Sequence, residues 1–165
     1  MSSFVDSKHQ KLSKDEIIAI AAKETGGKYT PEQIKASLMS EIHQMQALLM
    51  QEGNTLFIIH KSPEDPTVGL FRALNADTIQ NYLKNCLVFT KAIGLMGFKY
   101  MVTVFDDPSL INIFKHIGRN QPFKNMGYAV QKSKDGKQYK ITAYLGDTKK
   151  GGLPDKAMPK TQGAL

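Results

Sequence analysis

The side chains best suited to proton transfer in this chain are its four histidines and its carboxylates. His116 follows Asp106 and Asp107, but an aspartate at a helix start and a histidine near the helix end, roughly nine residues apart, face different turns. His60 stands at the end of an expected strand beside Lys61, and no sequence neighbour could orient it. A general acid or base needs a partner within hydrogen-bond reach. The sequence therefore predicts no assembled catalytic pair and no catalytic residue.

Metal-binding and nucleophilic motifs are also missing from the sequence. His43 lies on an expected helix without a second ligand at metal-ligand spacing. The one cysteine, Cys86, falls on the apolar face of another expected helix, which favours a small buried side chain over a reactive thiol. Gly94 and Gly97 follow a helix and precede a strand, which is the wrong direction for phosphate binding. We therefore expect no metal site, no nucleophile and no phosphate loop.

Lysines concentrate toward the C-terminal end of the chain. The net charge is +7, and residues 132–165 hold eight lysines against three aspartates. Such a segment can contact phosphates, dock on an acidic protein surface or keep the chain in solution. Strand alternation places Tyr139 and Lys140 on opposite faces, so the lysines do not form one basic stripe. The candidate interaction residues are Lys132, Lys134, Lys137, Lys149 and Lys150.

The chain is organised around one segment, residues 77–145, whose expected order is helix, strand, helix and hairpin. Residues 98–105 are almost continuously apolar and rich in β-branched and aromatic side chains, as expected of a central strand covered on both faces. Before this strand, Asp77 is expected to cap a helix that ends near Gly94 and Gly97. The apolar face of that helix should consist of Ile79, Leu83, Cys86, Leu87 and Ile93.

A second helix and a hairpin should follow the central strand. Asp107 and Pro108 form a helix start, and the apolar stripe of this helix is Leu110, Ile111, Phe114 and Ile117. Residues 128–131 and 139–144 are expected to pair as antiparallel strands. Between them, Asp135 and Gly136 should supply the positive φ angles of a tight hairpin turn.

The N-terminal half adds two helices and two strands. Ser13 with Glu16, and Thr30 with Gln33, are capping boxes, so helices are expected over residues 14–25 and from residue 31 to Leu49. Residues 54–60 and 68–74 are predicted strands joined by a proline-bounded turn. The fold class is therefore α+β, with a mostly antiparallel sheet of about five strands, flanking helices and extended arms at both ends.

The periodicity is confined to one expected domain, residues 13–145. Residues 1–12 form an arm, and residues 146–165 form a tail rich in glycine, proline and lysine without an apolar period. Ordering that tail would cost about 1–2 kcal/mol per residue, so we expect it to be ordered only by a partner. The sequence contains no run of ~18 apolar residues and no charged-then-apolar leader. We therefore expect a protein that is soluble, not secreted and without a membrane span.

The segment Pro108 to Gly118, followed by Gly127 and Tyr128, resembles the C-terminal half of the GNAT superfamily of N-acetyltransferases. The resemblance covers residues 56–145. The family's late helix, often written N-x-x-A-x-x-L-Y-x-K-x-G-F, precedes the last hairpin, and a Lys-x-x-Gly beginning at Lys115 is retained here. The chain also resembles small GNAT-like proteins of short-tailed bacteriophages, some of them virion-associated. This resemblance implies a location in the virion or the host cytoplasm.

The resemblance implies acetyl-CoA contacts that this sequence only partly supplies. They would fall on Met101, Val102 and Thr103 of the central strand and on Asn112 of the next helix. However, the family's Q/R-x-x-G-x-G/A loop is missing, because no glycine lies between Gly69 and Gly94. The family's tyrosine acid falls on Phe114 or Ile113, neither of which has a hydroxyl.

Three functions from different classes remain open from the sequence. The first is a degenerate, non-catalytic GNAT-like protein that is a structural or interaction component of a bacteriophage virion, with other protein subunits as partners and no cofactor. The second is an N-acetyltransferase with acetyl-CoA as its cofactor. The third is a DNA-associated basic protein whose binding would weaken steeply with salt.

Overall fold

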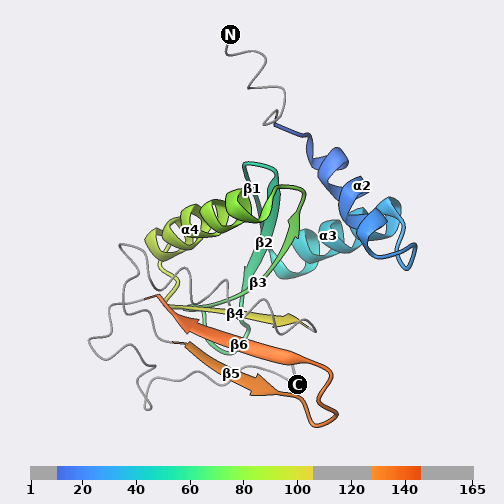
Figure 1. Cartoon of the computed structure of the whole chain (residues 1–165). Coiled ribbons are helices and arrows are strands. Elements are labelled where there is room, and N and C mark those ends of the chain that lie inside the picture. Colours follow the sequence, from blue (N-terminus) through green and yellow to red (C-terminus); the bar gives the residue numbers. More distant parts are fainter. Residues whose placement is uncertain (1–10, 106–127, 146–165) are drawn as a thin grey trace.

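The computed structural model describes residues 11–105 and 128–145, with the side chains of Phe105 and Tyr128 excepted. Figure 1 shows the arrangement of these elements. The helices of this part are α2 (Lys14–Glu24), α3 (Pro31–Met45) and α4 (Ile79–Leu95). The strands are β1 (Leu48–Glu52), β2 (Thr55–Lys61), β3 (Val68–Asn75), β4 (Tyr100–Phe105), β5 (Tyr128–Lys132) and β6 (Tyr139–Tyr144).

The strands form one mixed six-stranded sheet in the order β1-β2-β3-β4-β6-β5. All neighbouring strands are antiparallel except β3 and β4, which run parallel. The α+β class is confirmed, but the prediction of about five strands was wrong. The additional strand is β1, whose Leu48 and Leu49 were expected to continue α3. Helix α3 instead ends at Met45, and the next residue, Gln46, adopts a left-handed conformation with φ 54° and turns the chain into the sheet.

Helices lie on both faces of the sheet, with α4 on one side and α2 and α3 on the other (Figure 1). The side chains of strand β2 alternate between the two faces of the sheet and so pack against the helices on both sides. Phe57 and Ile59 join a core with Phe89 and Ile93 of α4, and the Phe57 and Phe89 rings stack at 4.1 Å between centroids. The opposite face of β2 packs against α2 and α3 through Leu56, Ile58, Ile17 and Leu38.

Two of the three described helices begin as the sequence predicts. Ser13 and Thr30 each form a complete capping box at the start of α2 and α3. The predicted cap of α4 was wrong, because Thr78 rather than Asp77 accepts the hydrogen bond from the amide of Asn81. Ile79 is consequently the first helical residue and is exposed, so it is not part of the buried face.

The central position of β4 confirms the prediction for residues 98–105. This strand pairs with β3 on one side and with β6 on the other. Three predicted features lie outside the described residues: the helix that begins at Pro108, with its stripe of Leu110, Ile111, Phe114 and Ile117; most of the N-terminal arm; and the tail of residues 146–165.

The hairpin that joins β5 to β6 forms between the two predicted strands, but its turn differs from the predicted one in conformation. Gly136 has φ 73°, whereas Asp135 does not have a positive φ, so the expected pair of left-handed residues was wrong. The turn is closed by the amide of Ser133, which donates to the carbonyl of Gln138 at 2.9 Å. The Asp135 carboxylate also accepts hydrogen bonds from the Ser133 hydroxyl and the Lys137 amide.

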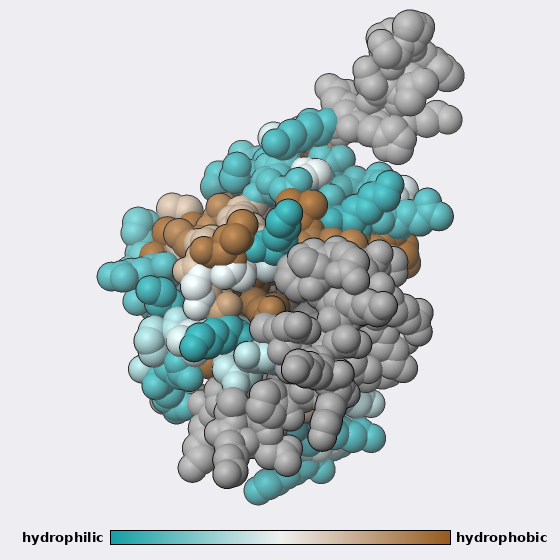
Figure 2. All heavy atoms as spheres, turned by 90° about the vertical axis from the view of Figure 1, so that its left-hand side faces the viewer, coloured by the Kyte–Doolittle hydropathy of each residue, from teal (hydrophilic) through white to brown (hydrophobic). Residues whose placement is uncertain are grey.

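Apolar side chains lie exposed on the side of the molecule where α4 packs. Figure 2 views that side and shows apolar surface interspersed with polar surface. Val88, Leu95 and Met96 contribute exposed apolar atoms there. Within residues 11–105 and 128–145, no helix combines the length and apolar character needed to cross a membrane.

Candidate functional site

A gap opens between the two central strands of the sheet. Strands β3 and β4 are paired only from Val68 and Tyr100 to Leu70 and Val102. Beyond these residues β3 remains paired with β2, and β4 remains paired with β6. The neighbouring strands thus diverge within the sheet, and a cavity of about 260 Å³ lies at the divergence.

Three charged or titratable side chains meet at this cavity. Glu41 comes from α3, His60 from the end of β2 and Arg72 from β3. His60 Nδ1 lies 3.0 Å from Glu41 Oε2, and Arg72 Nη2 lies 3.1 Å from Glu41 Oε1. Arg72 also donates from Nη2 to the Ser37 hydroxyl at 3.0 Å. We refer to Glu41, His60 and Arg72 as the Glu41 cluster.

The sheet register explains why the Glu41 cluster forms. His60 pairs with Leu70, and Arg72 pairs with Ile58, so the two side chains are diagonal neighbours on one face of the sheet. Packing of Leu38 against this face brings the next turn of α3, with Glu41, over both of them. The His60 and Glu41 side chains are only 12% and 17% exposed, whereas that of Arg72 is 43% exposed.

The Glu41 cluster gives His60 the partner that sequence reasoning missed. Glu41 is separated from His60 by nineteen positions along the chain and lies on a helix, so no motif spacing could link the two residues. Their contact depends on the packing of α3 over β2. A carboxylate that accepts from one nitrogen of an imidazole fixes the ring orientation, as in catalytic and ligand-binding histidines.

The sequence-predicted acetyl-CoA contacts separate into core and cavity residues. Met101 is buried with the α4 core, whereas Val102 is buried on the opposite face of β4 and lines the cavity. Thr103 also lines the cavity. The fourth residue, Asn112, lies outside the described part of the chain.

The start of α4 is joined to the turn between β1 and β2 by a polar network. Asp77 Oδ2 accepts hydrogen bonds from the amide of Asn54 and from Nδ2 of Asn85, both at 2.7 Å. Asn85 Nδ2 also donates to the Thr55 hydroxyl at 2.9 Å. We refer to Asn54, Thr55, Asp77 and Asn85 as the Asp77 network. It places a carboxylate one residue before the helix cap.

The lysines of the hairpin lie in two environments. Lys132, Lys134 and Lys137 are exposed, and Lys132 Nζ lies 5.9 Å from the centroid of the Tyr139 ring. Lys140, in contrast, is only 8% exposed. Burial lowers the pKa of Lys140 below its usual value, and the nearby Glu64 acts in the opposite direction. The remaining candidate interaction residues, Lys149 and Lys150, lie outside the described residues.

Cys86 lies in the core, as its position on an apolar helix face predicts. Burial raises the pKa of the Cys86 thiol to about 12, and a hydrogen bond with Tyr82 acts in the opposite direction. Burial likewise raises the pKa of Tyr82. A thiol with a raised pKa is a poor nucleophile because the thiolate is scarce at neutral pH. Cys86 is therefore a packing residue.

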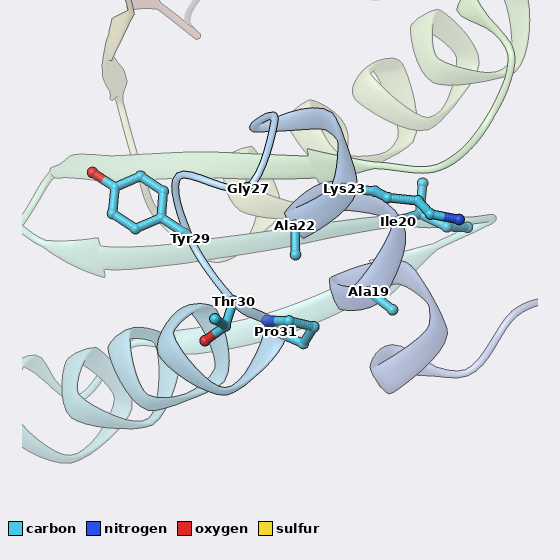
Figure 3. Close-up of a pocket in the computed structure, with 8 residues that line it drawn as sticks. All are labelled: Ala19, Ile20, Ala22, Lys23, Gly27, Tyr29, Thr30 and Pro31. Carbon is cyan, nitrogen blue, oxygen red and sulfur yellow. The ribbon is translucent and has the colours of Figure 1, made fainter.

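A second hollow lies between α2 and the start of α3 (Figure 3). Its volume is about 510 Å³, and Ala19, Ile20, Ala22 and Pro31 form much of its apolar lining. Figure 3 shows the Tyr29 hydroxyl and the Lys23 ammonium on opposite sides of the hollow. Its polar groups do not converge on one point, in contrast to the Glu41 cluster.

Comparison with known proteins assigns no family to the chain: no family model matches it, and no curated protein matches it significantly. Within the described residues, no three histidine, cysteine, aspartate or glutamate side chains gather in a group that could hold a metal ion. The candidate site is therefore defined by the cavity between β3 and β4 and by the Glu41 cluster beside it.

Proposed function

We propose that this protein is a degenerate GNAT-like domain that does not transfer acetyl groups and acts as a structural or interaction component of an assembly, in particular a bacteriophage particle. The order of α4, β4 and the β5–β6 hairpin agrees with the order on which the resemblance rests. The parallel neighbour of β4 is the strand that precedes α4. Both features support a GNAT-like arrangement of this half of the chain.

The observation that carries the non-catalytic part of the proposal is the Asp77 network. In the family, the glycine-containing loop before this helix uses bare amides to hold the pyrophosphate of acetyl-CoA. In this chain the corresponding position has an aspartate whose carboxylate already receives hydrogen bonds from Asn54 and Asn85. A second anion placed beside this carboxylate would be repelled.

Isothermal titration calorimetry with acetyl-CoA tests this part of the proposal. We expect no binding heat with the full-length protein. No glycine loop precedes α4, and the Asp77 carboxylate already lies next to the start of this helix, where the pyrophosphate would have to bind. Micromolar binding would overturn the non-catalytic assignment. Titration with 3′-phospho-ADP, which lacks the pantetheine arm, would show whether any heat arises from the nucleotide part alone.

The assembly part of the proposal is tested on particles. Mass spectrometry of purified native particles should detect the protein at a fixed ratio to the major structural subunits. Deletion of residues 146–165 should leave the melting temperature unchanged and abolish incorporation, if that tail is the tether. Absence of the full-length protein from the particles would refute a structural role there.

A second candidate function, acetyl-CoA-dependent N-acetyltransfer, is favoured by one specific observation. The cavity at the divergence of β3 and β4 lies beside Val102 and Thr103, and the Glu41 cluster borders it. An imidazole oriented by a carboxylate could accept a proton from an attacking amine. If acetyl-CoA binds, His60→Gln should lower turnover with little change in acetyl-CoA affinity, whereas His43→Gln should change neither.

A further inference from the structure

The Glu41 cluster has hydrogen-bonding capacity that its own contacts do not use. Glu41 accepts from Arg72 at Oε1 and faces His60 Nδ1 at Oε2. Because an ionised carboxylate only accepts hydrogen bonds, the neutral imidazole carries its proton on Nδ1. Its Nε2 is then an acceptor, and within the described residues no hydrogen bond to it is formed.

The cavity beside His60 is small and largely apolar. Leu70, Phe71, Val102 and Val104 line it together with the Glu41 cluster and Thr103. Its volume of about 260 Å³ is many times the ~10–15 Å³ that one water molecule requires. A compact molecule of about eight non-hydrogen atoms would fit this space. The apolar walls favour a hydrocarbon body, aromatic or aliphatic, because removing such surface from water is favourable.

The charge of the Glu41 cluster selects against an ionic ligand. The Glu41 carboxylate and the Arg72 guanidinium are 3.1 Å apart and compensate each other. With its proton on Nδ1 alone, the His60 imidazole adds no charge, so in that form neither an ammonium nor a carboxylate group would find a net opposite charge here. A neutral hydroxyl can donate one hydrogen bond to the imidazole without carrying a charge into a partly buried site.

We propose that the cavity between β3 and β4 is a binding site for a small apolar alcohol or phenol whose hydroxyl donates to Nε2 of His60. Glu41 acts as a positioning residue because it holds the imidazole in the Nδ1–H tautomer, and Arg72 keeps Glu41 in place. The site requires no acetyl-CoA and is separate from the start of α4. It therefore goes beyond the proposed assembly role.

A matched pair of probes tests this inference on the full-length protein by NMR titration. The two probes are p-cresol and its methyl ether, which share an apolar ring, whereas only p-cresol has a hydroxyl. We expect p-cresol to shift the amide resonances of Val102 and Val104 together with the His60 ring nitrogens. The ether should bind roughly two- to tenfold more weakly, the usual value of one net hydrogen bond.

Two variants and one ligand-free spectrum complete the test. His60→Phe keeps a ring but removes the acceptor, so it should abolish the preference for p-cresol over the ether. His43→Phe, an exposed site on α3, should preserve that preference. A long-range nitrogen–proton spectrum of the unliganded protein should show Nδ1 of His60 protonated.

Three results would overturn the inference, and none of them requires His60→Phe to fold. The first is equal affinity of the wild-type protein for both probes. The second is the absence of any shift at Val102 and Val104 with p-cresol. The third is a neutral His60 that carries its proton on Nε2 in the unliganded spectrum.

Discussion

Asn85, in the second turn of α4, donates a hydrogen bond from Nδ2 to Oδ2 of Asp77 at 2.7 Å. The same side chain reaches the Thr55 hydroxyl on β2 at 2.9 Å. One buried amide therefore joins the helix, the segment that precedes it and the neighbouring strand. This bond directs the Asp77 carboxylate toward Asn54 and away from a capping position.

Removal of this amide should destabilise the fold. Asn85→Ala removes one donor from the partly buried Asp77 carboxylate and one from the buried Thr55 hydroxyl. We expect a loss of about 1–3 kcal/mol in the free energy of unfolding, the usual cost of unsatisfied buried polar groups. Urea denaturation followed by circular dichroism measures it. Gln80→Ala, at an exposed site of the same helix, is the control and should change stability by less than about 0.5 kcal/mol.

The Asp77 network packs so closely against the backbone of Gly53 that a side chain at this position would clash with it. A Cβ added at Gly53 would lie 2.8 Å from Asn85 Oδ1 and 2.9 Å from Asp77 Oδ2, and the residue has φ 55°. Gly53→Ala therefore combines backbone strain with a steric clash. Gly26→Ala is the matched control, because Gly26 has φ 68° and nothing within 4 Å of its Cβ position.

The difference between these two glycine variants isolates the clash. We expect Gly53→Ala to lose about 1–3 kcal/mol more unfolding free energy than Gly26→Ala, the usual cost of overpacking. Equal losses would mean that the Asp77 network can move aside without cost.

Local sequence signals predicted the parts of this fold that depend on neighbouring residues. The capping boxes at Ser13 and Thr30 are local hydrogen-bond patterns, and both were predicted correctly. The central strand was found because its short apolar run is rich in β-branched and aromatic residues, which favours a strand inside a sheet. In contrast, β1 was missed because Leu48 and Leu49 continue the apolar spacing of α3. The residue that ends the helix before them, Gln46, is left-handed but is not a glycine, so the sequence contains no stop signal there.

The candidate site could not be predicted, because its contacts join distant parts of the chain. Glu41 meets His60 and Arg72 only after α3 packs on the face of β2 and β3. Asp77 illustrates the same limit: its sequence context fits a helix cap, but a stronger set of partners, Asn54 and Asn85, determines where the carboxylate lies.

Two valines on one face of β4 provide a test of the central core. Val102 is 1% exposed, and Val104 is 37% exposed. Val102→Asp should abolish cooperative unfolding or lower the melting temperature severely, because it buries an unpaired charge at a cost of roughly several kcal/mol. Val104→Asp should be tolerated much better, since water reaches its side chain. Differential scanning calorimetry measures the melting temperature of each variant. If Val102→Asp melted at the same temperature as the wild-type protein, the described core would be wrong.

The exposed hairpin lysines test the alternative of DNA association. We expect no mobility shift of duplex DNA at about 0.15 M salt, because the Asp135 carboxylate lies within the same turn as Lys134 and Lys137. Any shift at lower salt should disappear steeply as salt rises. A shift that survives physiological salt and is lost when Lys132, Lys134 and Lys137 are changed to Gln would support DNA binding. Lys14, Lys84 and Lys91, also exposed, form the matched control triple.

Lys140 should lower the free energy of unfolding by an amount that depends on pH. Its side chain is 8% exposed, and burial lowers its pKa relative to the unfolded chain. In the pH range between the lowered folded value and the unfolded value near 10.5, the unfolded chain binds more protons. The free energy of unfolding therefore contains a contribution from Lys140 that rises with pH in that window.

Lys140→Met should remove this contribution while keeping an unbranched side chain that is only one atom shorter. We expect the variant to gain at most about 1 kcal/mol at neutral pH, because no ammonium has to be desolvated but the attraction to Glu64 is also lost. Lys134→Met, at an exposed site on the same hairpin, is the control and should change stability little. Urea denaturation between neutral pH and pH 10 would measure both variants. A loss of stability in Lys140→Met at neutral pH would show that the attraction between the Lys140 ammonium and Glu64 outweighs its desolvation, and the predicted rise with pH would then be wrong.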